Sequence, residues 1–167
     1  RSQRVLSKID KGNYQPELRE VRVIELLQAL EKTFASNGSG NFLVLELEKL
    51  TEDEVIETDY TLLLRVLINM CKNALEATPP GGRVRFWHEA SPETVEFKVW
   101  NEGEIPREVA IRIFQRYFST KKQPGRGLGT YSMKLFGEGF LHGKVGFTSS
   151  LEDGTVFSLR MARRFGK

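Results

Sequence analysis

Residues 69–77 read Asn-Met-Cys-Lys-Asn-Ala-Leu-Glu-Ala and form the most informative stretch of the chain. They end an apolar pattern of helical period that begins after Asp59, which predicts one long helix over residues 59–77 with Asp59 as its cap. Steps of four and three residues place Asn69, Asn73 and Glu76 on one face of this helix. Asparagine is a mediocre helix former, so two aligned asparagines in mid-helix indicate a purpose. An amide oxygen suits Mg²⁺ shared with phosphate oxygens, although a plain polar stripe on an amphipathic helix has the same pattern.

A second polar cluster follows a predicted strand, where residues 99–106 read Val-Trp-Asn-Glu-Gly-Glu-Ile-Pro. Gly103 at the strand end permits the close approach of a flat ligand. Asn101 beside it can form hydrogen bonds with the edge of that ligand. A simple strand-to-helix turn would fit the same residues.

A third cluster, Lys-Lys-Gln-Pro-Gly-Arg-Gly-Leu-Gly-Thr over residues 121–130, precedes a predicted helix. Its alternating glycines expose backbone N–H groups, and the N-terminus of a helix favours anions. The cluster lacks the Gly-Lys-Ser/Thr of a P-loop and the preceding strand of a dinucleotide fingerprint. A flexible linker would fit it equally well.

The rest of the chain predicts strands and helices in about equal number. Helices are predicted over residues 21–34, 59–77, 107–114 and 131–141, and strands over residues 42–47, 55–58, 83–89, 94–100, 144–149 and 155–161. Two pairs of strands form hairpins, and no regular strand–helix–strand alternation is present. The pattern favours an α+β fold with a helical layer on one face of a mixed sheet.

Composition limits the class of protein. Among 167 residues, 40% are hydrophobic and 28% charged, which is typical of a globular domain. The single cysteine, Cys71, excludes an internal disulfide, and no apolar run is long enough for a membrane span. We therefore expect a cytoplasmic location for this part of the protein. The net charge of +3 is too small and dispersed to indicate a nucleic-acid partner.

In this order the three clusters resemble the nucleotide-binding domain of bacterial sensor histidine kinases, a branch of the superfamily that includes gyrase, Hsp90 and mismatch-repair proteins. Residues 69–77 resemble the N box, 101–106 the first glycine box, 113–118 the phenylalanine box, 125–129 the second glycine box and 154–157 the terminal Gly-Thr-x-Phe. The resemblance implies a Bergerat-type two-layer α/β sandwich. In that fold about three helices cover one face of a mixed, mostly antiparallel sheet, and ATP lies between the helices and a lid.

The resemblance also implies roles for individual residues. Asn73 is similar to the family's magnesium ligand and Asn69 to a neighbour of the metal and phosphates, so both are the expected catalytic residues. Asn101 stands where the family usually has the aspartate that accepts a hydrogen bond from adenine. Phe114 and Phe118 are expected to anchor the lid. The other expected nucleotide-binding residues are Gly103, Ile105, Arg116, Phe118, Lys121, Lys122, Gly125, Gly127, Leu128, Gly129 and Thr155.

Three residues depart from the family or discriminate between its branches. An amide at Asn101 accepts a hydrogen bond without the strength of a charge. Glu76 stands where other kinases often have a lysine, which leaves more of the phosphate charge to the lid. In the gyrase and Hsp90 branches a glutamate at the position of Asn69 is the general base for hydrolysis, and an amide cannot accept that proton.

The implied function is the ATP-binding catalytic domain of a two-component sensor histidine kinase that uses ATP and Mg²⁺. It would present the γ-phosphate to a histidine on an upstream segment, for relay to an aspartate of a response regulator. Residues 1–15 are expected to be the tail of that dimerisation and phosphoacceptor segment, and residues 16–167 the catalytic domain. We expect His88 to be packed and His142 to lie at the surface, so autophosphorylation is not expected of this chain alone. A degenerate scaffold of the same fold, or another ATPase or serine kinase of the superfamily, are the alternatives.

Overall fold

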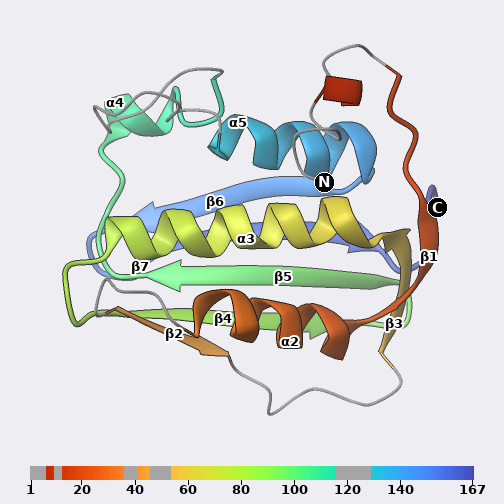
Figure 1. The fold of residues 1–167 in the computed structure, drawn as a ribbon. Coiled ribbons are helices and arrows are strands. Elements are labelled where there is room, and N and C mark those ends of the chain that lie inside the picture. The colour runs from red at the N-terminus through yellow and green to blue at the C-terminus, as the bar shows by residue number, and fades with distance from the viewer. Residues whose placement is uncertain (1–6, 10–12, 36–40, 46–53, 116–128) are drawn as a thin grey trace.

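The computed structural model describes residues 7–9, 13–35, 41–45, 54–115 and 129–167, and Figure 1 shows their arrangement. The strands are β1 (Leu18–Arg22), β2 (Phe42–Leu45), β3 (Val55–Asp59), β4 (Arg83–Ala90), β5 (Thr94–Asn101), β6 (Lys144–Ser150) and β7 (Gly154–Ala162). The helices are α2 (Val23–Phe34), α3 (Tyr60–Ala77), the short α4 (Arg107–Ala110), α5 (Gly129–Lys134) and the π-helix η1 (Leu135–Phe140). None of these helices is long and apolar enough to cross a membrane.

The main sheet has five strands in the order β2-β4-β5-β7-β6. The pair β2–β4 is parallel and the other three pairs are antiparallel, as expected for two hairpins placed side by side. The register sets Asn101 of β5 opposite Thr155 of β7, and Thr155 opposite Ser149 of β6. Three polar residues on neighbouring strands therefore meet at one end of the sheet. Strands β1 and β3 form a separate antiparallel pair.

Helices α2, α3, α5 and η1 lie over one face of the five-stranded sheet (Figure 1). Side chains along β5 alternate between buried and half-buried, as expected of a strand with one covered face. The completely buried Leu63, Leu67 and Met70 of α3 belong to the same core as Phe86 and Phe97 of the sheet. The predicted α+β fold, with a helical layer on one face of a mixed sheet, is confirmed.

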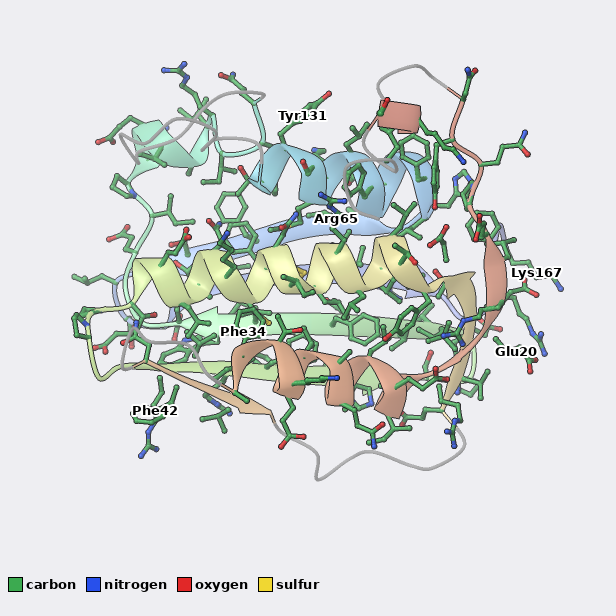
Figure 2. All side chains as sticks on the ribbon, viewed as in Figure 1. Glu20, Phe34, Phe42, Arg65, Tyr131 and Lys167 are labelled. Carbon is green, nitrogen blue, oxygen red and sulfur yellow. The ribbon has the colours of Figure 1, made fainter. Side chains whose placement is uncertain are left out.

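Helix α3 carries the 69–77 stretch and has a well-defined start. The Asp59 carboxylate accepts a hydrogen bond of 2.9 Å from the backbone N–H of Leu62, which satisfies one of the unpaired donors of the first turn. Arg65 projects from α3 toward the α5–η1 layer, as Figure 2 shows, and its guanidinium lies 5.7 Å from the centre of the Phe136 ring. The long helix predicted from Asp59 to Ala77 is confirmed.

The structure corrects several predicted boundaries. Helix α2 begins at Val23, because Val21 belongs to β1, a strand that the periodicity did not predict. The helix predicted over residues 107–114 is regular only over Arg107–Ala110 and continues as turns. The helix predicted over residues 131–141 begins at Gly129 and widens into η1, where a Cβ on Gly137 would lie 2.5 Å from Val145. Strand β2 ends at Leu45, and residues 46–47 of the predicted strand lie outside the described residues.

Candidate functional site

A cleft of about 470 Å³ lies between the C-terminal part of α3 and the loop that follows β5. Its lining combines residues of α3, of the end of β5 and the loop after it, of α4 and the turn after it, and of β7. They are Asn73, Ala74, Glu76, Ala77, Asn101, Glu102, Gly103, Glu104, Ile105, Pro106, Val109, Ile113, Thr155 and Phe157. The N box, the first glycine box and the terminal Gly-Thr-x-Phe, which are far apart in sequence, thus contribute to one cavity.

Helix α3 supplies one wall of the cleft. Asn73 is half-buried and Glu76 is exposed, and both line the cavity, while Ala74 between them is buried in the core. Asn69 lies one turn earlier on α3 and is half-buried, but it is not among the lining residues. Of the two predicted catalytic residues, only Asn73 therefore borders the cleft.

The opposite wall begins at Asn101, the last residue of β5. Asn101 is 6% exposed, and its Nδ2 donates a hydrogen bond of 3.0 Å to the backbone carbonyl of Glu102. This bond orients the amide and leaves Oδ1 as an acceptor, with no donor to it in the described part of the chain. Gly103 follows with a φ of 106°, a conformation that side-chain-bearing residues rarely adopt.

Hydrogen bonds from β6 and β7 hold this loop in place. The Ile105 N–H donates to Ser149 Oγ at 2.7 Å, and Ser149 Oγ lies 2.8 Å from Thr155 Oγ1. Thr155 Oγ1 in turn donates to the Gly103 carbonyl at 2.8 Å. Sequence reasoning found Thr155 but missed Ser149. Its only signal was its place across the predicted β6–β7 hairpin from Thr155, which depends on the register.

Aromatic rings back the cleft on the side of α4. Phe157 lines the cavity and stacks on Phe147, with ring centres 5.4 Å apart. The Phe114 ring packs edge-on against both, at 5.9 Å from Phe147 and 6.3 Å from Phe157. Phe114 therefore fixes the chain just before residue 116, where the predicted lid begins.

The segments before and after the predicted lid are joined by a hydrogen bond. The Thr130 hydroxyl, in the first turn of α5, donates a hydrogen bond to the backbone carbonyl of Ile113. Gly129 begins α5 and does not line the cleft. The other predicted lid residues, Arg116, Phe118, Lys121, Lys122, Gly125, Gly127 and Leu128, lie outside the described residues.

Comparison with known proteins identifies this arrangement. Residues 58–164, which include both walls of the cleft, match the family described as "Histidine kinase-, DNA gyrase B-, and HSP90-like ATPase". The chain belongs to this ATPase family.

Sporulation kinase A of Bacillus subtilis is 33% identical over 147 residues, which cover 86% of this chain and 23% of that protein. The solved catalytic domain of the histidine kinase ThkA, in a nucleotide-free form, is 31% identical with a TM-score of 0.77, over 89% of this chain and 97% of that one. A structure of ThkA in complex with the response regulator protein TrrA has a TM-score of 0.76 at 26% identity, over 97% of this chain and 47% of that one. The chain is thus a histidine kinase-type ATPase domain and spans about a quarter of Sporulation kinase A.

The described lining of this ATPase domain's cleft is acidic. It includes the exposed carboxylates Glu76, Glu102 and Glu104 and no lysine or arginine. Such a lining repels a polyphosphate unless cations are supplied to it. Near Ile113 along the chain, the basic residues are Arg107 and Arg112, which do not line the cleft, and Arg116, Lys121 and Lys122 of the predicted lid.

The donor set fits Mg²⁺ better than a transition metal. Among the described residues, no group of three or more His, Cys, Asp or Glu side chains could hold a metal ion. The cleft instead offers the side-chain amide of Asn73, whose oxygen can bind a metal ion. Mg²⁺ is commonly held by one or two protein oxygens with water and phosphate oxygens completing its shell, so Asn73 fits it.

The two histidines of the ATPase domain lie away from the cleft lining. His88 is 3% exposed and its Nε2 forms a hydrogen bond with the Glu54 carboxylate. His142 is exposed, with a φ of 55° and its ring against Phe165. The expectation of a packed His88 and a surface His142 is confirmed.

Proposed function

We propose that this domain binds Mg-ATP in the cleft between α3 and the β5 loop and presents the γ-phosphate to a histidine outside residues 16–167. The phosphoryl group would then pass to an aspartate of a response regulator. The family supports the ATP part of this proposal, and the ThkA–TrrA complex shows that a similar kinase binds a response regulator. Residues 1–15 would be the tail of the segment that carries the histidine, and the domain would act in the cytoplasm.

One observation carries the proposal: Asn73 on α3 faces the same cavity as Asn101, Gly103 and Thr155 on the opposite wall. The first residue suits a metal-bound phosphate, and the other three suit the edge and face of a flat base. Bound Mg²⁺ would supply the positive charge that the described lining lacks. Asn73 would give it an amide oxygen, and Asn101 Oδ1 would accept a hydrogen bond from the adenine amino group.

Transfer is favoured over hydrolysis because α3 carries no general base at Asn69. Phosphoryl transfer depends mainly on positioning and on charge neutralisation, whereas rapid hydrolysis needs a base for the attacking water. Asn69 would act as a polar neighbour of the phosphates. The predicted lid residues, named above, would meet those phosphates from the other side.

Calorimetric titration with a non-hydrolysable ATP analogue, with and without Mg²⁺, tests the proposal. We expect Mg²⁺-dependent binding that Asn73→Ala weakens at least tenfold, about 1.4 kcal/mol. Asn13→Ala is the matched control, because Asn13 is exposed and lies outside the cleft lining. Absence of binding to a folded protein at millimolar analogue would instead support a scaffold of the same fold.

A further inference from the structure

The hydrogen bonds that join Ile105, Ser149, Thr155 and Gly103 form a series with one direction. A backbone N–H can only donate and a backbone carbonyl can only accept. The Thr155 hydroxyl donates its hydrogen bond to the Gly103 carbonyl, so the Ser149 hydroxyl must be the donor in the bond between Ser149 and Thr155. Ser149 Oγ in turn accepts from Ile105. Both ends of the series are backbone groups, so the hydroxyl protons cannot reverse.

This direction determines what Thr155 offers to the cleft. The Thr155 hydroxyl donates one hydrogen bond and accepts another, so its oxygen has one unused lone pair, which can accept a hydrogen bond. Asn101, the register partner of Thr155, uses its Nδ2 on the Glu102 carbonyl and retains Oδ1 as an acceptor. At this end of the sheet Asn101 Oδ1 and Thr155 Oγ1 can therefore both act as hydrogen-bond acceptors.

We propose that Ser149 is a positioning residue that sets the base specificity of the cleft. An exocyclic amino group, as in adenine, donates two hydrogen bonds and suits a pair of acceptors. The keto oxygen at the same position of guanine is itself an acceptor and would meet them unpaired. Ser149 is not among the cleft-lining residues, so its effect passes through Thr155 and the 103–105 backbone. This inference rests on the proposed function.

Removal of the Ser149 hydroxyl releases both of its neighbours. In Ser149→Ala, the Ile105 N–H loses its acceptor. Thr155 loses the hydrogen bond from Ser149, which had kept the Thr155 hydroxyl hydrogen directed at the Gly103 carbonyl. The Thr155 hydroxyl can then rotate and donate into the cleft, which suits a keto group. Ser149→Thr keeps a hydroxyl on a β-strand and should restore the series.

The test compares dissociation constants for non-hydrolysable ATP and GTP analogues, with Mg²⁺, by calorimetry. In Ser149→Ala we expect the ratio of the GTP-analogue constant to the ATP-analogue constant to fall about tenfold, the effect of one hydrogen bond. Ser149→Thr should retain the wild-type ratio. Ser158→Ala, the same change on the uncovered face of the sheet, should also leave it unchanged, because Ser158 lies outside the cleft lining.

The outcomes separate specificity from simple support of the loop. An unchanged ratio in Ser149→Ala, or an equal loss of affinity for both analogues, would overturn the inference while leaving the proposed function intact. Should Ser149→Ala fail to fold, Ser149→Cys has nearly the same shape with weak hydrogen bonding, and the same fall in ratio is expected. A folded wild-type protein that binds neither analogue overturns the proposed function, and this inference with it.

Discussion

The phenol hydroxyl of Tyr14 donates a hydrogen bond of 2.6 Å to Oδ2 of Asp59, 45 residues further along the chain. The same oxygen accepts a bond of 2.8 Å from the backbone N–H of Glu17. The other oxygen, Oδ1, caps α3 through Leu62. One carboxylate, only 1% exposed, therefore ties the segment before β1 to the helix that carries Asn73.

Loss of this carboxylate should destabilise the whole domain. Asp59→Ala removes the cap of α3 and leaves two other donors without their partner, so we expect the free energy of unfolding to fall by about 3 kcal/mol. Tyr14→Phe removes a single bond and should cost about 1 kcal/mol. Urea unfolding measures both. Equal effects of the two substitutions would contradict the claim that Asp59 stabilises the domain through more than its bond with Tyr14.

The Tyr14 hydroxyl should also make stability depend on alkaline pH. Burial, and then its hydrogen bond to Asp59, raises the pKa of Tyr14 above the ordinary value of 10.0. The folded state thus retains this proton more strongly than the unfolded state. Its contribution is complete below the unfolded pKa and is lost as pH rises toward the folded pKa. The stability difference between wild type and Tyr14→Phe should therefore stay constant up to about pH 9 and shrink as pH rises above about 10. A constant difference would contradict this linkage.

The sequence predicted α3 well because both its ends carry local signals. Asp59 precedes the apolar pattern, and Pro79 and Pro80 follow it. Strand β1 had no such signal, because Val21 continues the spacing of α2. What makes residues 18–22 a strand is pairing with β3, which lies more than 30 residues later. Local periodicity contains no information about a partner at that distance.

The sequence likewise predicted only part of the candidate site. Asn73, Asn101, Gly103 and Thr155 could be predicted because each belongs to a short motif, and the fold brings all four to one cleft. Ser149 belongs to no motif. Its role arises only when the β6–β7 register places it opposite Thr155, with the 103–105 backbone within hydrogen-bond distance.

Gly103 offers a matched test of backbone conformation. Gly103 and Gly81 both have positive φ, 106° and 83°, and neither has an atom within 4 Å of an added Cβ. Alanine at either position should therefore cost about 1–2 kcal/mol of stability through strain alone. Only Gly103→Ala should weaken binding of the ATP analogue, about tenfold, because the Gly103 carbonyl accepts from Thr155. An equal loss of binding in both variants would place the effect in stability.

Glu76 should oppose nucleotide binding. Its exposed carboxylate lines the cleft on the same helix as Asn73, so it repels the phosphates. We expect Glu76→Gln to tighten binding of the ATP analogue about threefold at low salt, with a smaller gain at high salt as ions screen the repulsion. Glu31→Gln, an exposed change on α2, is the control. Loss of Mg²⁺-dependent binding in Glu76→Gln would instead identify Glu76 as a metal ligand.

Cys71 should report on α3 from inside the core. It is the only cysteine of the chain and is completely buried, and burial raises the pKa of its thiol. A thiol reagent should therefore label the native protein only through unfolding. Because a ligand bound to the native state suppresses that opening by the factor 1 + [L]/Kd, Mg-ATP analogue at 100 times its Kd should slow labelling about 100-fold. Asn73→Ala, with binding weakened at least tenfold, should reduce the slowing to about 10-fold or less at the same analogue concentration. Rapid labelling of the native wild type would show that α3 opens without global unfolding.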